Sequence, residues 1–101
     1  IVIVDLNAQQ ALDYTRNVID LDSITEKWES FNWHVKTVDG HDVNALASAM
    51  ENNSEKPLVI FAETTFGKGV SYMENKIKWH YWPMSDEEYD QAMRELQQVE
   101  A

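Results

Sequence analysis

Apolar residues come in short blocks along the chain, and three of these blocks have the pattern of β-strands. The runs at residues 1–4 and 58–62 are continuously apolar, which is typical of strands buried on both faces of a parallel sheet. Residues 33–38 alternate apolar and polar side chains, as in a strand near the edge of a sheet. We therefore expect two buried strands and one peripheral strand.

Three further segments predict helices that begin after Ser23, Asp42 and Ser85. Ser23 and Glu26 have the spacing of a capping box, and so do Ser85 and Glu88. Asp42 is expected to cap the middle helix through its side chain. The apolar positions expected on the buried faces of the three helices are Ile24, Trp28 and Phe31; Val43, Leu46, Ala47 and Met50; and Tyr89, Met93, Leu96 and Val99.

The alternation of strands and helices predicts an α/β fold, with a parallel sheet and helical crossovers. Residues 5–22 and 64–83 are polar stretches too long for ordinary connections, and they follow the first and third strands. Ligands bind beyond the carboxyl ends of the strands in open sheets of this class. We therefore expect the two stretches to converge on one site.

Composition excludes several classes of function. Eighteen acidic residues against eight basic ones give 101 residues a formal charge of −10, which disfavours binding to nucleic acid or anionic membrane. The absence of Cys excludes disulfides, thiol chemistry and Cys-based zinc sites. No apolar run approaches the roughly 20 residues of a membrane span, and no signal peptide is recognisable. We expect a cytoplasmic protein of one domain or less.

The stretch from residue 64 to residue 82 reverses the overall charge. Its charged and titratable side chains are Lys68, Lys76, Lys78 and His80, against Glu74 alone. A phosphate or another anion complements such a segment, although lysines that are merely solvated would look the same. Gly67 and Gly69 allow close approach of the backbone to a ligand, and a tight loop after a strand is an equally common reason for them.

Two further positions have side chains suited to a ligand. Asn7 follows the first strand, and its amide oxygen together with nearby carbonyls suits a hard cation such as Mg²⁺ or Ca²⁺. The segment Asp5-Leu6-Asn7 also suits a simple Asx turn. Among the histidines, His80 is the candidate for site chemistry, because it lies in the cationic stretch between Trp79 and Tyr81. That aromatic cluster equally suits a contact with another protein chain.

A series of segments resembles the carboxyl-terminal half of the diphosphate-binding domain of transketolase, in the form split over two polypeptides. The segments are residues 5–10, Lys27-Trp28, residues 38–42 (Val-Asp-Gly-His-Asp), Lys56-Pro57, residues 64–75 and Trp79-His80. The resemblance covers residues 1–101. It implies a thiamine diphosphate-binding fold, the cofactors thiamine diphosphate and Mg²⁺, and a transferase that moves a two-carbon ketol unit between sugar phosphates.

The resemblance also implies roles for individual residues. Asn7 would bind the metal through its side chain, and Gln9 through its backbone carbonyl. His80 would lie near the cofactor diphosphate and the donor's reacting hydroxyls, and would be the catalytic residue of this chain. The cofactor-binding residues would be Gln9, Ala11, Phe66, Gly67, Lys68 and His80.

The chain also departs from the family pattern. Aliphatic residues are usual where Gln9 and Ala11 stand, and Gly is usual where Asp13 and Tyr81 stand. These changes concern the shape of the pocket and therefore the substrate. They leave open a specialised thiamine diphosphate-dependent carboligase of a biosynthetic pathway, or a scaffold subunit without catalysis.

The resemblance further implies partner chains. The family's Gly-Asp-Gly segment, which carries another metal ligand, would precede Ile1, and the glutamate that activates the cofactor belongs to a different domain. We therefore expect one partner that carries the Gly-Asp-Gly half and one that carries the pyrimidine-binding domain. The chain would be incomplete as a catalyst without them.

Overall fold

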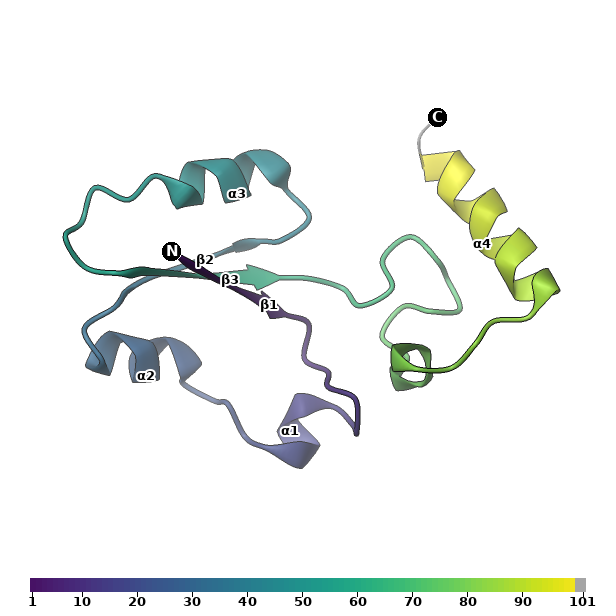
Figure 1. Ribbon diagram of the computed structural model, residues 1–101, viewed down its shortest axis with the longest axis horizontal. Coiled ribbons are helices and arrows are strands. Elements are labelled where there is room, and N and C mark those ends of the chain that lie inside the picture. Colours follow the sequence, from purple (N-terminus) through teal and green to yellow (C-terminus); the bar gives the residue numbers. More distant parts are fainter. Residues whose placement is uncertain (100–101) are drawn as a thin grey trace. The chain divides into compact units, whose positions relative to one another are not determined.

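The computed structural model describes residues 1–99 and shows the expected α/β architecture (Figure 1). β1 (Val2–Leu6), β2 (His34–Asp39) and β3 (Leu58–Glu63) form a parallel sheet in the order β1-β3-β2. The helices are α1 (Thr15–Val18), α2 (Ile24–Ser30), α3 (Val43–Met50), the 3₁₀ helix η1 (Ile77–His80) and α4 (Asp86–Val99). The predicted parallel sheet with helical crossovers is confirmed.

The core lies along β3, the central strand. Leu58, Val59, Ile60 and Phe61 are completely buried, as their continuous apolar run predicts. Side chains alternate between the two faces of a strand, so burial of consecutive residues requires cover on both faces. Figure 1 shows α2 and α3 on opposite sides of the sheet. Leu58 and Ile60 pack with α3. The Phe61 ring contacts the Trp28 ring of α2 edge-to-face, with the ring centroids 6.1 Å apart.

β2 and β1 are both edge strands in the described chain. The peripheral position of β2 is confirmed. The expectation that the first apolar run is buried on both faces is wrong here, since Ile3 is 50% exposed and Val2 is 36% exposed. The reason is that α2 and α3 pack mainly against β2 and β3 within residues 1–99, so that the faces of β1 are less covered.

α3 begins as predicted, but only part of its expected apolar face is buried. The Asp42 carboxylate accepts hydrogen bonds from the backbone N–H groups of Asn44 and Ala45, at 2.9 and 3.0 Å. The buried residue of the helix is Ala49, whereas Val43 is 77% exposed. Of the expected face, Leu46 is partly buried and packs against Ala49, Leu58 and Ile60, whereas Val43, Ala47 and Met50 are exposed.

α2 begins at the predicted position without the predicted cap. Ser23 has a left-handed backbone conformation, with φ 58°, and its side chain makes no capping hydrogen bond. The Ser23–Glu26 capping box is therefore wrong. Phe31 is also misassigned, since it follows the helix and is 79% exposed, whereas Ile24 and Trp28 are half-buried.

α4 shows the capping box that α2 lacks. The backbone N–H of Ser85 donates to the Glu88 carboxylate at 2.8 Å, and the Glu88 N–H donates to Ser85 Oγ at 3.2 Å. The expected apolar stripe is exposed at Tyr89, Met93 and Leu96, and among the described side chains of the helix Ala92 is the buried one. The Val99 side chain lies outside the described ones.

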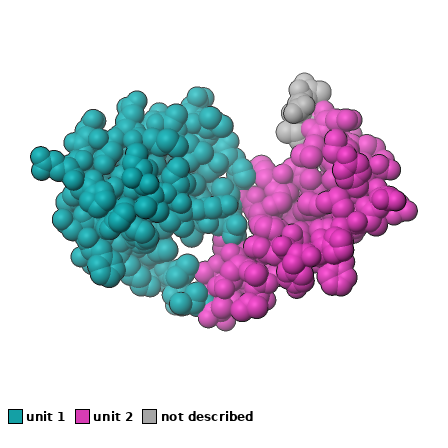
Figure 2. Space-filling model, in the orientation of Figure 1, with its two compact units in different colours: residues 1–7, 19–64 teal, residues 8–18, 65–101 magenta. Residues whose placement is uncertain are grey.

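The chain divides into two compact units (Figure 2). Unit 1 comprises residues 1–7 and 19–64 and contains the sheet, α2 and α3. Unit 2 comprises residues 8–18 and 65–101 and, over its described part, contains α1, η1 and α4. The two long stretches are thus less irregular than expected, because α1 and η1 form within them. No helix in residues 1–99 is both long and apolar enough to cross a membrane.

Candidate cofactor-binding site

The two long stretches converge, as predicted from the topology. β1 and β3 run in parallel and end opposite one another, with Leu6 paired to Glu63. Residues 8–18 and 65–83 of the stretches that follow belong to one compact unit, and the Tyr14 hydroxyl donates to the Asn75 carbonyl at 3.1 Å. Segments about 60 residues apart in sequence are therefore joined within unit 2.

Polar groups mark the carboxyl ends of β1 and β3. The Thr64 hydroxyl donates to the Asp5 carboxylate, and the Thr64 backbone N–H donates to the Leu6 carbonyl at 3.3 Å. The Asp5 carboxylate is thereby engaged in joining the two strand ends. Asn7 follows at the next partly buried position and offers the amide oxygen that a hard cation prefers.

The segment after Asn7 closes into a small loop. Ala8 has a left-handed conformation, with φ 60°, and its carbonyl accepts a hydrogen bond from the Thr15 N–H at 2.8 Å. The Gln10 N–H donates to the Asp13 carbonyl at 3.0 Å, which completes a bridge between Gln9 and Tyr14. Within this loop Gln9 is buried and Ala11 is exposed.

Asp13, where the family pattern has Gly, helps to close this loop. Its carboxylate accepts hydrogen bonds from the Asn17 side chain at 3.0 Å and from the Tyr14 backbone N–H at 2.6 Å. The Asn17 hydrogen bond is the largest cause that lowers the pKa of Asp13, followed by the Tyr14 N–H; nearby Arg16 lowers it further. The departure at this position thus has a local structural explanation.

The two glycines of the second stretch adopt the backbone conformations that glycine favours. Gly67 has φ 71° and Gly69 has φ 92°. A Cβ on Gly67 would lie 2.8 Å from the backbone of Met73, so the turn excludes any side chain there. The tight turn therefore explains why residue 67 is a glycine. Close approach of a ligand to the backbone is not needed to explain it.

Phe66 and His80 are brought together by this loop. Their rings stack with centroids 4.7 Å apart and an angle of 24° between the planes. His80 ends η1 and is exposed, whereas Phe66 is partly buried. Of the predicted cofactor residues, these two show a direct side-chain contact.

One of the three lysines of the cationic stretch is engaged by other side chains of unit 2. The Lys78 ammonium lies 3.8 Å from the Glu88 carboxylate and sits over the rings of Trp79 and Trp82, at 4.5 and 5.7 Å from their centroids. Lys78 is therefore used within unit 2. Lys68 and Lys76 are exposed and remain the candidates for attracting an anion.

A hydrogen-bonded support that sequence reasoning missed holds the loop against α4. The Glu95 carboxylate accepts hydrogen bonds from the Ser71 N–H at 2.6 Å, the Ser71 hydroxyl at 2.7 Å and the Gln91 amide at 2.7 Å. These bonds, that of Gln91 foremost, lower the pKa of Glu95. The Tyr72 hydroxyl also donates to the Glu88 carbonyl at 2.6 Å. No sequence spacing pairs residues 24 positions apart, so only the fold reveals this support.

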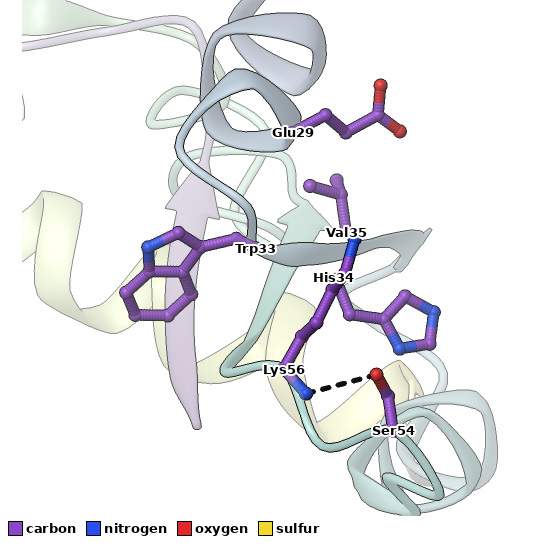
Figure 3. Close-up of a pocket in the computed structure, with 6 residues that line it drawn as sticks. All are labelled: Glu29, Trp33, His34, Val35, Ser54 and Lys56. Atoms are coloured by element: carbon purple, nitrogen blue, oxygen red, sulfur yellow. Dashed lines mark hydrogen bonds between the residues drawn. The ribbon is translucent and has the colours of Figure 1, made fainter.

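A separate hollow lies in unit 1, at the amino-terminal end of β2 (Figure 3). Its volume is about 540 Å³, and its lining residues are Glu29, Trp33, His34, Val35, Ser54 and Lys56. None of the predicted site residues lines it. In a parallel sheet this end of β2 is opposite to the edge where Asn7 stands, so the hollow is distinct from the candidate site.

The donor groups suit a small charged ligand rather than a metal held by the chain alone. Within residues 1–99, no group of three or more His, Asp or Glu side chains could hold a metal ion. A cation at this edge would therefore rely on amide and carbonyl oxygens together with ligands from another molecule. The fold and these groups define an α/β domain of the kind that binds a cofactor beyond its strand ends.

Comparison with known proteins specifies which domain of this kind it is. Residues 1–99 match the family described as transketolase, thiamine diphosphate binding domain, and the chain belongs to this family. The resemblance inferred from the motifs is thereby confirmed, together with the thiamine diphosphate-binding fold. The individual roles of Asn7, Gln9, Ala11 and the residues of the 66–80 stretch stay predictions.

Three relatives show the range of the family. The chain is 34% identical over 99 residues to an apulose-4-phosphate transketolase subunit from Phocaeicola vulgatus, covering 95% of this chain and 35% of that protein. It is 34% identical over 100 residues to the 6-deoxy-6-sulfo-D-fructose transketolase subunit SqwG of Clostridium sp., covering 96% and 36%. Identity to the transketolase of Homo sapiens is 30% over 96 residues, covering 95% and 15%. The chain thus spans little more than a third of the two subunits it matches.

Proposed function

We propose that this chain forms part of a transketolase-like enzyme that transfers a two-carbon ketol unit between sugar phosphates with thiamine diphosphate and Mg²⁺. The observation that carries the proposal is the family match over residues 1–99, in a fold whose two long stretches meet within unit 2. Family membership supports the cofactor class, and the meeting of the two stretches supports a binding site formed by them.

The residues present fit this cofactor and its metal. The Asn7 amide oxygen and the Gln9 backbone carbonyl are oxygen donors of the kind that Mg²⁺ accepts, with diphosphate oxygens supplying further ligands. Exposed Lys68 would attract the diphosphate electrostatically. When bound, thiamine diphosphate supplies the carbon nucleophile of the transfer, and the protein binds and orients it.

His80 would act directly on the substrate. Its imidazole is exposed at the end of η1, where it can meet another molecule. An imidazole both donates and accepts hydrogen bonds near neutral pH, so His80 would hydrogen-bond a donor hydroxyl and move its proton. Replacing His80 with Ala should lower kcat by at least about 100-fold, the usual loss for a general acid–base group.

The rest of the enzyme would come from outside these 101 residues. The first two relatives are named as subunits, and this chain spans about a third of each. We propose that one partner supplies the Gly-Asp-Gly half of the domain and another the pyrimidine-binding domain. Exposed large apolar side chains support this, since such surfaces are typical of contacts with another chain; in unit 2 they include Leu12 (81%), Tyr81 (69%) and Trp82 (56%).

Calorimetry on the assembled enzyme tests the proposal. The chain, combined with the polypeptides that supply the missing parts, should bind thiamine diphosphate in the presence of MgCl₂. Asn7→Ala should weaken Mg²⁺-dependent binding by about tenfold or more. Asn53→Ala is the matched control, because Asn53 is exposed in unit 1 and should leave binding unchanged. The proposal would be overturned if no combination of the polypeptides bound the cofactor. Ketol transfer that remained unchanged in Asn7→Ala would favour a scaffold role.

A second candidate is a carboligase specialised for an unusual sugar. Tyr81 and Trp82, both more than half exposed, directly follow His80 and would restrict the donor or acceptor that reaches it. The two subunits named above carry names that specify apulose 4-phosphate and 6-deoxy-6-sulfo-D-fructose. Assays with common ketopentose and aldopentose phosphates separate the candidates. Rapid transfer between these common substrates would exclude the specialised enzyme.

A further inference from the structure

The stack between Phe66 and His80 points to a role for Phe66 that differs from cofactor contact. We infer that Phe66 is a positioning residue that fixes the plane of the His80 imidazole. The centroids of the two rings are 4.7 Å apart, and their planes are 24° from parallel. This positioning role rests on the proposed function only in giving His80 a catalytic task.

The backbone around Phe66 is constrained, so the Phe66 ring can restrain a neighbouring side chain. The Phe66 backbone carbonyl accepts a hydrogen bond from the Asn75 N–H at 2.9 Å. The next residue, Gly67, has φ 71° and packs against the Met73 backbone so closely that no Cβ fits. Both ends of the turn from residue 66 to residue 75 are thereby fixed, and the ring projects from a constrained backbone.

The His80 imidazole, in contrast, has few restraints of its own. Its backbone is placed by η1, whose neighbouring residue Trp79 donates from its indole N–H to the Tyr72 carbonyl at 3.0 Å. No hydrogen bond or ion pair holds the imidazole itself among residues 1–99. Stacking on Phe66 is therefore the contact that restricts rotation of the exposed ring. Restricted rotation of the ring matters for catalysis, because misplacement of a catalytic group by about 1 Å can lower the rate about 100-fold.

NMR on the cofactor-free protein tests the stack without reference to catalysis. The wild-type protein should show nuclear Overhauser contacts between the Phe66 ring and the His80 ring protons, with His80 signals shifted upfield by the Phe66 ring current. Phe66→Leu should abolish that shift, whereas Phe66→Tyr should keep it because the aromatic face remains. Phe31→Leu is the matched control, since Phe31 is 79% exposed in unit 1. Absence of the contacts in the wild type, or an unchanged His80 shift in Phe66→Leu, would overturn the inference.

Kinetics of the assembled enzyme test whether the orientation matters. Phe66→Leu should lower kcat by about tenfold, within the range that misplaced catalytic groups produce, while the KM of the donor changes little. Phe66→Tyr should restore kcat to near the wild-type value. A normal kcat in Phe66→Leu, with the His80 shift lost, would overturn the positioning role. If the wild-type assembly were inactive, the proposed function would fail, and the NMR comparison would still decide whether Phe66 orients His80.

Discussion

The two compact units of the chain are built on different physical terms. In unit 1, six apolar residues are buried, five of them consecutive along β3; they are Ala49, Leu58, Val59, Ile60, Phe61 and Ala62. In the described part of unit 2, the buried apolar residues are Val70 and Ala92. Unit 2 is instead shaped by glycines with positive φ, by side-chain hydrogen bonds to its backbone and by aromatic contacts.

This difference matters for function. Of the residues predicted to bind cofactor or metal, Asn7 is the last residue of the first segment of unit 1, and the others lie in unit 2. Binding groups are often carried on loops that a rigid scaffold positions, since loops can vary without loss of the core. Under the proposed function, unit 1 would supply the packed core, and unit 2 would carry most of the binding groups.

The largest effect should come from the core of unit 1. Phe61→Ala removes a completely buried ring and should lower the free energy of unfolding by about 3–5 kcal/mol. Phe31→Ala, at a position that is 79% exposed, should change it by no more than about 0.5 kcal/mol. Denaturant unfolding followed by circular dichroism measures both. Similar losses from the two variants would mean that β3 does not form the core.

The next effect should come from the constrained turn of unit 2. Gly67→Ala forces a side chain into a left-handed conformation and against the Met73 backbone, so it should cost about 2–3 kcal/mol and weaken cofactor binding. Gly69→Ala shares the positive φ, but its Cβ would meet only the end of the flexible Leu96 side chain, at 3.2 Å. It should therefore cost about 1 kcal/mol less. Unfolding and cofactor titrations compare the two, and a larger loss for Gly69→Ala would contradict this packing.

The same division separates what could be predicted from sequence from what could not. β3 was predictable because its apolar run leaves no polar side, and the caps at Asp42 and Ser85 were predictable because each depends on neighbours within three residues. Ser23 shows the limit of that logic, since its left-handed backbone prevents the cap that its spacing suggests. Local patterns succeed where the interaction itself is local.

Other unpredicted features depend on distant parts of the chain. The exposure of β1 depends on which elements cover its faces, and an apolar run carries no information about that. The contacts of Ser71 with Glu95 and of Phe66 with His80 require the 64–83 stretch to fold before its partners can be identified. Topology predicted that the two long stretches would meet, because parallel strands end together, but not how their side chains support one another.

Two helix caps provide a matched pair across the units. Ser85→Ala removes the acceptor of the Glu88 N–H, and Asp42→Ala removes the acceptor of two N–H groups of α3. Each should cost about 1 kcal/mol of stability. Only Ser85→Ala should also weaken cofactor binding, because α4 supports the loop that contains Ser71. If both variants weakened cofactor binding equally, the two units would not differ in their contribution to the site.

The smallest effect should be a pH dependence of unit 2 that arises from Glu95. Hydrogen bonds from Gln91 and Ser71 lower its pKa in the folded state from the ordinary 4.5, so the folded state binds this proton less readily than the unfolded state. Its contribution to stability is therefore complete above about pH 4.5 and is lost as the pH falls through the lowered folded value.

Glu95→Gln should destabilise the protein slightly at pH 7, and the difference from wild type should narrow on acidification. Asp90→Asn, at an exposed position of the same helix, controls for the loss of one charge. Urea unfolding at about pH 7 and about pH 3.5 measures the effect, and a difference that widens in acid would show that the Ser71 contact does not depend on the ionised carboxylate.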